Sequence, residues 1–352
     1  MNAVSHKIAR RVLLGVAYGD AMGMPTETLT RDQIIKRFGR VTDFLPSPHG
    51  DDIPFVRDFR PGQVTDDTDN TMMLCRMLGH TSGKIDPDLF VDYLIRWLDE
   101  DPSSAFAVGP STKRAIEAIQ HGVPIDQAGR MGTTNGAAMK ISPIGIVDDY
   151  RDMPGLVDDV AAVCTPTHNT TVAIQGAAAV AACVSYGARV GDANGIMDWD
   201  LWYDLIADAV HEAARCGHPY PSPDLLRRID YGRQIANESI SDDVFEDTLY
   251  SFLGTGLETA ETVPAAVTIV YRHQGDLRRS VECAANIGGD TDTIGAICGA
   301  MCAGIGFNLS DAVIHTLETV NHMNFDAAAS LLLEADGSKE TDNSPSKERR
   351  VQ

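Results

Sequence analysis

The stretch "NIGGDTDTIGAICGA" (residues 286–300) sets two acids, Asp290 and Asp292, between a double glycine and a run that is almost entirely apolar. We expect this run to form a helix over residues 291–306. One aspartate at its start has a simple explanation as an N-cap, because backbone N–H groups there lack partners and carry partial positive charge. A cap requires only one side chain, however. Asp290, Thr291, Asp292 and Thr293 together therefore indicate a further role.

A second stretch, "QVTDDTDNTMMLCRML" (residues 63–78), has the same arrangement, with Asp66, Asp67 and Asp69 ahead of an apolar helical run that begins near Met72. Five acids at the starts of two buried helices would repel one another if the helices met without compensation. A hard cation would remove that conflict, because Mg²⁺ and Mn²⁺ favour oxygen ligands from carboxylates, hydroxyls and water. Two such ions could share bridging carboxylates.

A third group of acids lies near the N-terminus, in "GVAYGDAMGMPTE" (residues 15–27). Its glycines recur every four residues, a spacing that favours close helix packing through small residues. Asp20 stands near the end of the predicted helix and Glu27 in the loop that follows. Negative charge is not favoured at that end by the helix dipole. This placement indicates functional acids.

Apolar residues recur at helical spacing along most of the chain, and alternating strand patterns are scarce, so the sequence predicts an all-α fold. The Ala-rich segment 170–189 is expected to be a fully buried helix. One further helix is expected around the apolar stripe of Leu89, Tyr93, Leu94 and Leu98. The other helices expected, beyond those named above, span residues 111–121, 155–164, 200–216, 222–238, 263–273, 276–286 and 309–322.

The chain of 352 residues is long enough to bury a substantial core. No stretch within the body has linker composition, and no tandem repeat of fixed period is found. We therefore expect one compact domain over residues 1–334. Residues 335–352 are polar, charged and without periodicity, which predicts a disordered, mobile tail.

The amino-acid composition limits which classes of partner and which cellular compartment the sequence predicts. With 50 acidic against 29 basic residues, the net charge of -21 disfavours binding to nucleic acid. The N-terminus lacks the pattern of a signal peptide, and no window approaches the roughly 18 uninterrupted apolar residues of a membrane span. The seven cysteines include no C-x-x-C pair. We interpret them as reduced core thiols of a cytoplasmic protein with no membrane partner.

Two further stretches carry candidate ligand-binding residues. In "GRMGTTNGAAMKISPIGI" (residues 129–146), small and turn-forming residues could bring backbone N–H groups close to a ligand, although the stretch could equally be a long connection. In "CTPTHNTTVAIQGAA", His168 precedes a helix whose cap could be Asn169 or Thr170. A lone histidine at such a position is more often structural than catalytic.

Taken together and in this order, these motifs resemble the ADP-ribosylglycohydrolase family, which includes the enzyme that removes ADP-ribose from dinitrogenase reductase. The resemblance spans residues 19 to 300. It rests on "GDAMGMPTE", "TDDTDNTMML", "TNGAAMKISPIG", "THNTTVA" and "GGDTDTIGAICGA". Either acidic motif alone would be weak, whereas the pair is specific.

The resemblance implies a compact, single-domain helical bundle with a central cleft that holds two Mg²⁺ or Mn²⁺ ions. It places Glu27 beside the metal centre, and we take Glu27 or Asp67 as the catalytic acceptor of a water proton. The implied metal ligands are Thr65, Asp66, Asp67, Asp290, Asp292 and Thr293. The implied substrate-binding residues are Asp20, Gly109, Ser111, Asn135, Gly136, Ala137, Met139, His168 and Gly289.

The reaction implied is hydrolysis of an N- or O-ribosidic bond, with release of ADP-ribose from an ADP-ribosylated protein or small molecule. The sequence departs from the family pattern in the segment that would bind the diphosphate of ADP-ribose. Where family members that grip ADP carry a glycine-rich loop, "FAVGPSTKRAIEAI" has only Gly109, followed by Pro110, Ser111 and Thr112, although a helix N-terminus there could still bind phosphate.

Two alternatives remain. A free nucleoside or another small riboside is the second substrate class, because the glycine-rich loop is missing. A non-catalytic binding or structural homologue is the third reading, against which the full set of acidic ligands argues.

Overall fold

The computed structural model describes residues 4–51, 53, 57–101, 104–238, 240–306 and 308–342. All regular elements in these ranges are helices, and extended pairing is limited to isolated bridges. The α-helices are α1 (His6–Gly23), α2 (Arg31–Phe38), α3 (Asp66–His80), α4 (Pro87–Glu100), α5 (Ser104–Ala107), α6 (Pro110–Gln120), α7 (Ile125–Ala128), α8 (Ser142–Val147), α9 (Met153–Cys164), α10 (Thr171–Asp192), α11 (Trp199–Ala213), α12 (Leu225–Asn237), α13 (Asp242–Thr248), α14 (Thr259–Arg272), α15 (Leu277–Ile287), α16 (Thr291–Ala303), α17 (Asp311–Asn321) and α18 (Phe325–Asp342). Short 3-10 turns η1 (Met24–Thr26) and η2 (Asn135–Ala137) and a π-helical turn η3 (Leu249–Leu253) complete the set.

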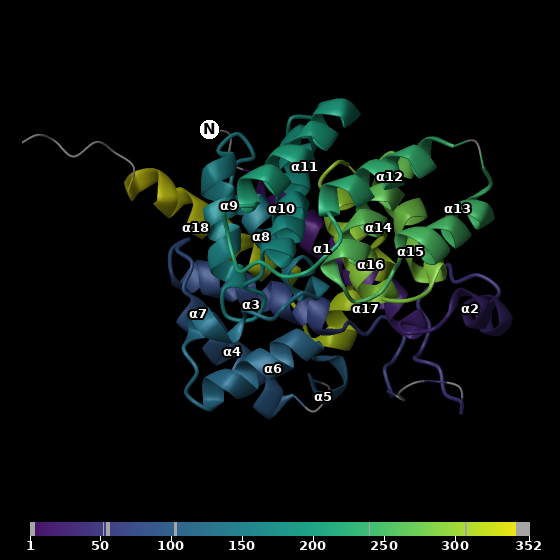
Figure 1. Cartoon of the computed structure of the whole chain (residues 1–352), viewed down its shortest axis with the longest axis horizontal. Coiled ribbons are helices and arrows are strands. Elements are labelled where there is room, and N and C mark those ends of the chain that lie inside the picture. The colour runs from purple at the N-terminus through teal and green to yellow at the C-terminus, as the bar shows by residue number, and fades with distance from the viewer. Residues whose placement is uncertain are drawn as a thin grey trace, which may run out of the picture.

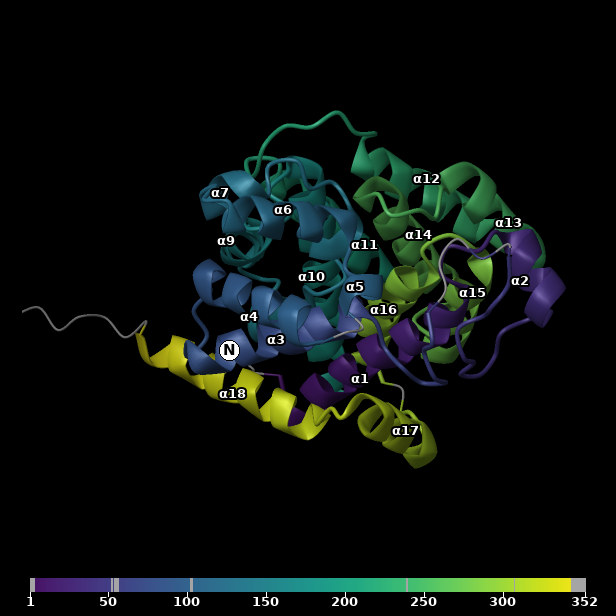
Figure 2. The same cartoon turned by 90° about the horizontal axis from the view of Figure 1, so that it is seen from below.

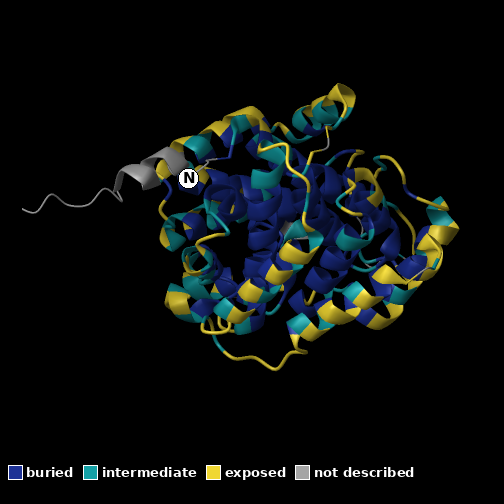
Figure 3. Cartoon of the chain, turned by 90° about the horizontal axis from the view of Figure 1, so that it is seen from above, coloured by how far each residue is buried: buried dark blue, intermediate teal, exposed yellow. Residues whose placement is uncertain are grey.

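Helices α1 and α16 form the centre of the molecule, although they come from opposite ends of the chain (Figure 1). Helices α10, α14 and α15 pack around α16, and α3 and α18 pack against α1 (Figure 2). Buried residues concentrate on these inner helices, whereas exposed residues lie on the outer ones (Figure 3). The all-α, single-domain architecture predicted from the sequence is confirmed.

The two central helices touch through glycine. A Cβ atom added at Gly19 would lie 1.9 Å from the carbonyl oxygen of Gly295, and one at Gly299 would lie 1.9 Å from the carbonyl oxygen of Gly15. Any side chain at these positions would push the backbones apart. The four-residue glycine spacing therefore serves the close packing that the sequence predicts.

Helix α10 is long and apolar enough to cross a membrane by length and composition alone, but 89% of its apolar window is buried inside the fold. It contacts α8, α9, α11 and α16, and its alanines leave room for these neighbours. The expected buried Ala-rich helix is thus present in the core, between these neighbouring helices.

Every helix predicted from periodicity is present, with ends that shift by a few residues. Helices α2, α5, α7, α8, α13 and α18 were not predicted. Helix α2 is short, buries Ile34 in the core and begins with a capping box between Thr30 and Gln33. Residues 129–146, which could have been only a connection, contain η2 and α8.

Helix α18 enters the segment 335–352 that the sequence predicts to be a mobile tail, and the mobility of that segment stays a prediction. Helix α18 continues to Asp342, because extending an established helix adds one hydrogen bond for each residue that is fixed. The rest of the predicted tail, residues 343–352, lies outside the described residues. The domain boundary at residue 334 stays a prediction.

Candidate active site

Helix α3 begins with its acids inside the first turn rather than ahead of it, and its cap comes from another helix. The N-cap residue, Thr65, makes no side-chain cap of its own. Asp20 of α1 accepts instead from the backbone N–H groups of Thr65, at 3.0 Å, and Thr68, at 3.1 Å, and from the Thr68 hydroxyl at 2.6 Å. A carboxylate at a helix N-terminus complements the helix dipole. Asp20 is fully buried and thereby fixes the start of α3 against α1.

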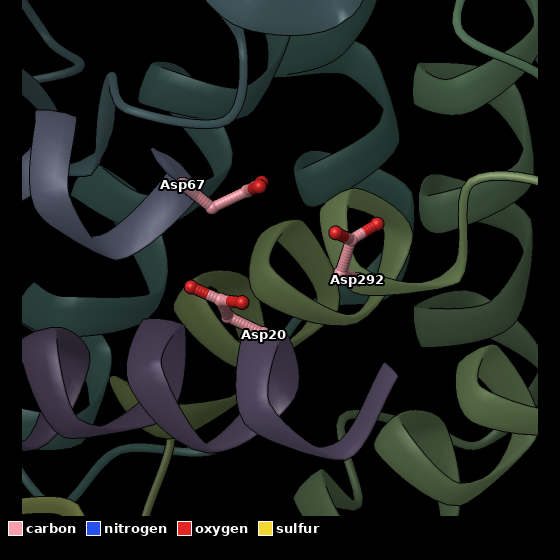
Figure 4. Close-up of side chains that lie close together, drawn as sticks. All are labelled: Asp20, Asp67 and Asp292. Atoms are coloured by element: carbon pink, nitrogen blue, oxygen red, sulfur yellow. The ribbon is translucent and has the colours of Figure 1, made fainter. Parts of the chain in front are cut away.

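This arrangement brings the two acidic motifs together. Carboxylate oxygens of Asp20, Asp67 and Asp292 lie within 4.8 Å of one another, and we call these three residues the Asp67 set. Their side chains come from α1, α3 and α16 and point toward a common space (Figure 4). The Asp67 Oδ2 atom accepts from the Thr65 hydroxyl at 3.0 Å and from the Thr293 hydroxyl at 3.4 Å.

A second group adjoins the first and shares Asp292. Carboxylate oxygens of Glu27, Asp290 and Asp292 also lie within 4.8 Å of one another, and we call these the Glu27 set. The Asn135 amide nitrogen donates to Asp290 and, at 2.7 Å, to the hydroxyl of Thr262. Asn135 therefore ties η2 to the start of α16.

The double glycine turns the chain so that α16 can begin at this place. Gly288 and Gly289 have φ values of 86° and 85°, a region that side chains disfavour. A Cβ atom at Gly289 would also lie 2.3 Å from the carbonyl oxygen of Thr255. The backbone N–H of Asp290 then donates to that carbonyl at 2.7 Å. Both glycines are needed for the geometry of the turn.

Burial raises the pKa of these carboxyl groups above their usual range, and neighbouring acids raise it further for Asp66, Asp290 and Asp292, whereas hydrogen bonds from Thr65 and Thr68 partly offset the rise at Asp20. The pKa reaches about 6 for Asp20, about 7 for Asp290, and about 8 for both Asp66 and Asp292. The pKa of Asp67 also lies well above its usual range, first because of burial and then because of Asp20. Ionising all these groups at neutral pH therefore requires added positive charge.

A divalent cation fits this donor set. The Oδ1 atom of Asp67 is buried and has no hydrogen-bond partner, which is costly for a carboxylate oxygen unless a ligand binds it. Carboxylate and threonine hydroxyl oxygens surround it, and these are the ligands that Mg²⁺ and Mn²⁺ prefer. The Asp67 and Glu27 sets could each hold one ion, with Asp292 between them.

A cavity of about 320 Å³ opens beside the acids, a volume typical of small-molecule sites. Ten of the residues predicted for the site line it, from the acidic motifs, η2 and the start of α6: Glu27, Asp66, Gly109, Asn135, Gly136, Met139, His168, Asp290, Asp292 and Thr293. The other predicted residues are buried or turn residues outside the lining: Asp20, Thr65, Asp67, Ser111, Ala137 and Gly289. The individual roles assigned to these residues stay predictions.

His168 lies at the wall of the cavity with both ring nitrogens engaged. Its Nδ1 is 2.7 Å from the Thr167 hydroxyl and its Nε2 is 3.1 Å from the Thr134 hydroxyl. Burial lowers the pKa of His168 well below its usual range, so the ring is neutral. A Cβ atom at Gly136 would lie 2.8 Å from the ring. These contacts support a structural role, in which His168 shapes the loop that carries Asn135.

Sequence reasoning missed several residues of the site. Thr134 and Leu257 line the cavity next to an antiparallel bridge between Thr134 and Glu258, which depends on a long-range pairing. Arg57 forms an ion pair with Glu27 but belongs to no motif. The acid-rich patterns gave no signal for neutral or basic residues brought in by other loops.

The comparisons with known proteins indicate a glycohydrolase-type enzyme. The family model for ADP-ribosylglycohydrolase matches residues 1–339, so the chain belongs to the ADP-ribosylglycohydrolase family.

Relatives span nearly the whole chain. An uncharacterized protein of Escherichia coli (strain K12), YegU, is 34% identical over 91% of this chain and 94% of its own. The ADP-ribosyl-[dinitrogen reductase] glycohydrolase of Rhodospirillum rubrum is 25% identical over 87% of each chain. A solved ADP-ribosylglycohydrolase-related protein complex shares the fold, with a TM-score of 0.66, 22% identity, and coverage of 95% of this chain and 98% of that one.

Proposed function

We propose that this protein hydrolyses an N- or O-ribosidic bond with the help of two divalent cations, Mg²⁺ or Mn²⁺, and that its default substrate carries an ADP-ribosyl group. The observation that carries the proposal is the meeting of the Asp67 and Glu27 sets beside a cavity, with the Oδ1 atom of Asp67 buried and without a partner. The glycohydrolase relative from Rhodospirillum rubrum supports the ADP-ribosyl group.

Hydrolysis forms a bond between water oxygen and ribose C1 and breaks the bond from C1 to the leaving nitrogen or oxygen. Positive charge develops on the sugar as that bond breaks. Cations held by the two acidic sets would lower the pKa of nearby water and fix the ribose hydroxyls. The negative charge that remains around the cavity favours a cationic transition state.

The chain's own residues would then handle the proton and the sugar. Glu27 lines the cavity, whereas Asp67 lies behind it, so Glu27 is the better placed of the two candidate proton acceptors. The proton would pass from water to this carboxylate and on to the leaving group. Asn135 would hold the Asp290 carboxylate in place.

One observation favours the second substrate class, a small riboside without diphosphate. Among the residues that the structure describes, none of those lining the cavity is a lysine or arginine. Helix α6 points its N-terminus at the cavity, but Pro110 at its first position lacks an N–H. A nucleoside would meet mainly apolar contacts there, from Ala107, Val108, Met139 and Leu257.

A release assay distinguishes these readings. ADP-ribosyl-arginine, ADP-ribosyl-serine, O-acetyl-ADP-ribose and a nucleoside panel would each be incubated with the protein and Mg²⁺ or Mn²⁺. Release of ADP-ribose supports the default substrate, whereas release of ribose from nucleosides alone supports the second class. A protein that binds metal but cleaves none of these compounds would overturn the proposal, as would one that binds no metal.

A further inference from the structure

Arg57 stands in the loop between α2 and α3, at a place that the loop itself fixes. The hydroxyl of Ser47 donates to the Arg57 carbonyl at 2.5 Å and accepts from the Phe59 N–H at 2.9 Å. The backbone N–H of Ser47 also donates to the Phe59 carbonyl at 3.1 Å. The Arg57 guanidinium lies 5.3 Å from the centre of the Phe59 ring. These contacts leave the arginine little freedom to turn away.

The guanidinium faces the Glu27 set. It forms an ion pair with Glu27, in which the side chains of Arg57 and Glu27 are only 5% and 13% exposed. Asp292 and Asp66 also attract it. Because both partners are largely out of water, this pair is weakly screened by salt.

The Asp67 set has a different environment. Every hydrogen bond recorded for Asp20 comes from a neutral donor, the backbone or hydroxyl of Thr65 and Thr68. Asp67 likewise receives only the hydroxyls of Thr65 and Thr293, and its Oδ1 atom has no partner. Among the described residues, an arginine is therefore paired with Glu27 in the Glu27 set, whereas the hydrogen bonds to Asp20 and Asp67 come from neutral donors.

The geometry points to Arg57 as a positioning residue that makes the two cation positions unequal. A cation binds first and tightly to the Asp67 set. The Glu27 set binds a second cation more weakly, because that ion must share or displace the guanidinium on Glu27. This inference rests on the proposed function, since it presumes that the acids bind divalent cations.

The test is a titration of the full chain with Mn²⁺, in which free Mn²⁺ is measured by electron paramagnetic resonance. The unaltered protein is expected to show two classes of site. The Arg57→Gln variant is expected to bind the weaker ion about tenfold more tightly, because one positive charge beside its ligand is gone. The tighter class should stay within about twofold, because Glu27, the carboxylate that Arg57 pairs with, is not a member of the Asp67 set.

Two control variants distinguish a change in Mn²⁺ affinity caused by the lost charge from one caused by a disturbed fold. Arg57→Lys keeps the charge and is expected to restore the weaker class. Arg60→Gln removes the same charge from the same loop, but Arg60 is exposed and donates to the carbonyl of Val320, so it should leave both classes unchanged.

The outcomes are distinct. Two classes of site with no tightening in Arg57→Gln, or the same tightening in Arg60→Gln, would overturn the role of Arg57 and leave the proposed function standing. An Arg57→Gln protein that melts normally yet binds the weaker ion less tightly would also overturn it. No bound Mn²⁺ in the unaltered protein would instead remove the proposed metal centre, and the role of Arg57 with it.

Discussion

Gly19 of α1 and Gly295 of α16 meet backbone to backbone, so close that a Cβ atom at Gly19 would lie 1.9 Å from the Gly295 carbonyl oxygen. Each glycine stands next to the acids of its own helix. Asp20 follows Gly19 directly, and Asp292 lies one turn before Gly295. The contact between the helices therefore sets the separation of the carboxylates.

We expect Gly19→Ala to destabilise the protein and to weaken metal binding together. The added methyl must push α1 away from α16, and such overpacking costs about 1–3 kcal/mol or more. Gly109→Ala is the matched control for stability, because a Cβ atom there meets nothing within 4 Å. Thermal melts and Mn²⁺ titration check both variants. A Gly19→Ala protein with unchanged melting temperature and metal affinity would contradict the prediction.

The metal-free protein is expected to lose stability as pH rises from about 4 to about 8. The Asp carboxyls have a usual pKa of 3.8, and in the folded state the pKa is raised to about 7 for Asp290 and about 8 for Asp292. Between these values the folded state holds protons that the unfolded state releases, so each unit of pH removes stability. Bound cations should offset this loss. Mn²⁺ is expected to raise the melting temperature more at pH 8 than at pH 5, and an equal rise at both would count against the prediction.

Asp292→Asn tests the same repulsion by removing one charge. In the presence of EDTA at pH 8 the variant is expected to be more stable than the unaltered protein by about 1–3 kcal/mol, because an amide need not be desolvated as an ion. With Mn²⁺ the order should reverse, since Asp292 belongs to both acidic sets. Urea unfolding at both conditions measures this, and a destabilised metal-free variant would refute it.

Glu27→Gln is expected to lower kcat by about 10²- to 10⁴-fold, the usual contribution of a general base. Metal binding at the Asp67 set should survive, because Glu27 is not one of its members. Asp67→Asn is the comparison and should lose both activity and the tighter metal ion. If Glu27→Gln kept full activity, Asp67 would be the remaining candidate for the proton acceptor.

His168 is expected to stay neutral from pH 5 to pH 8, because burial lowers its pKa well below the usual 6.5. Nitrogen chemical shifts of its ring should not change over this range by NMR. The unfolded chain would take up a proton below pH 6.5 that the folded ring refuses, so His168 contributes to loss of stability in acid. A ring that titrates near pH 6.5 would show that it is less buried than the contacts with Thr134 and Thr167 indicate.

The helical fold was predictable because apolar periodicity is a local property, and buried helices such as α10 and α16 carry it strongly. The meeting of Asp67 with Asp292 was predictable for another reason. Carboxylates at the starts of two buried helices are costly to keep charged, because burial and mutual repulsion both oppose ionisation. A shared cation removes that cost, which is why the sequence predicts that the two motifs meet. Helix α2 could not be predicted in this way, because it has only 8 residues and buries a single apolar side chain, Ile34, which is too short a pattern for periodicity to reveal.

The remaining features depend on contacts that no local pattern reveals. Arg57 pairs with Glu27 from a loop whose backbone is held by Ser47, and neither contact has a local sequence pattern. Leu257 reaches the cavity through pairing of its neighbour, Glu258, with Thr134. The role predicted for Asp20 in substrate binding stays a prediction, and its hydrogen bonds to the start of α3 could not be foreseen from the local sequence.

The capping of α3 by Asp20 has a consequence for how such proteins evolve. A lineage that lost catalysis would be free to replace Asp67, whose Oδ1 atom stabilises nothing within the chain. It would keep Asp20, because the start of α3 would fray without it. Among descendants of this fold, an aspartate at the position of Asp20 would therefore persist for its cap alone and says little about metal binding, whereas one at the position of Asp67 indicates that the proposed cation site is kept.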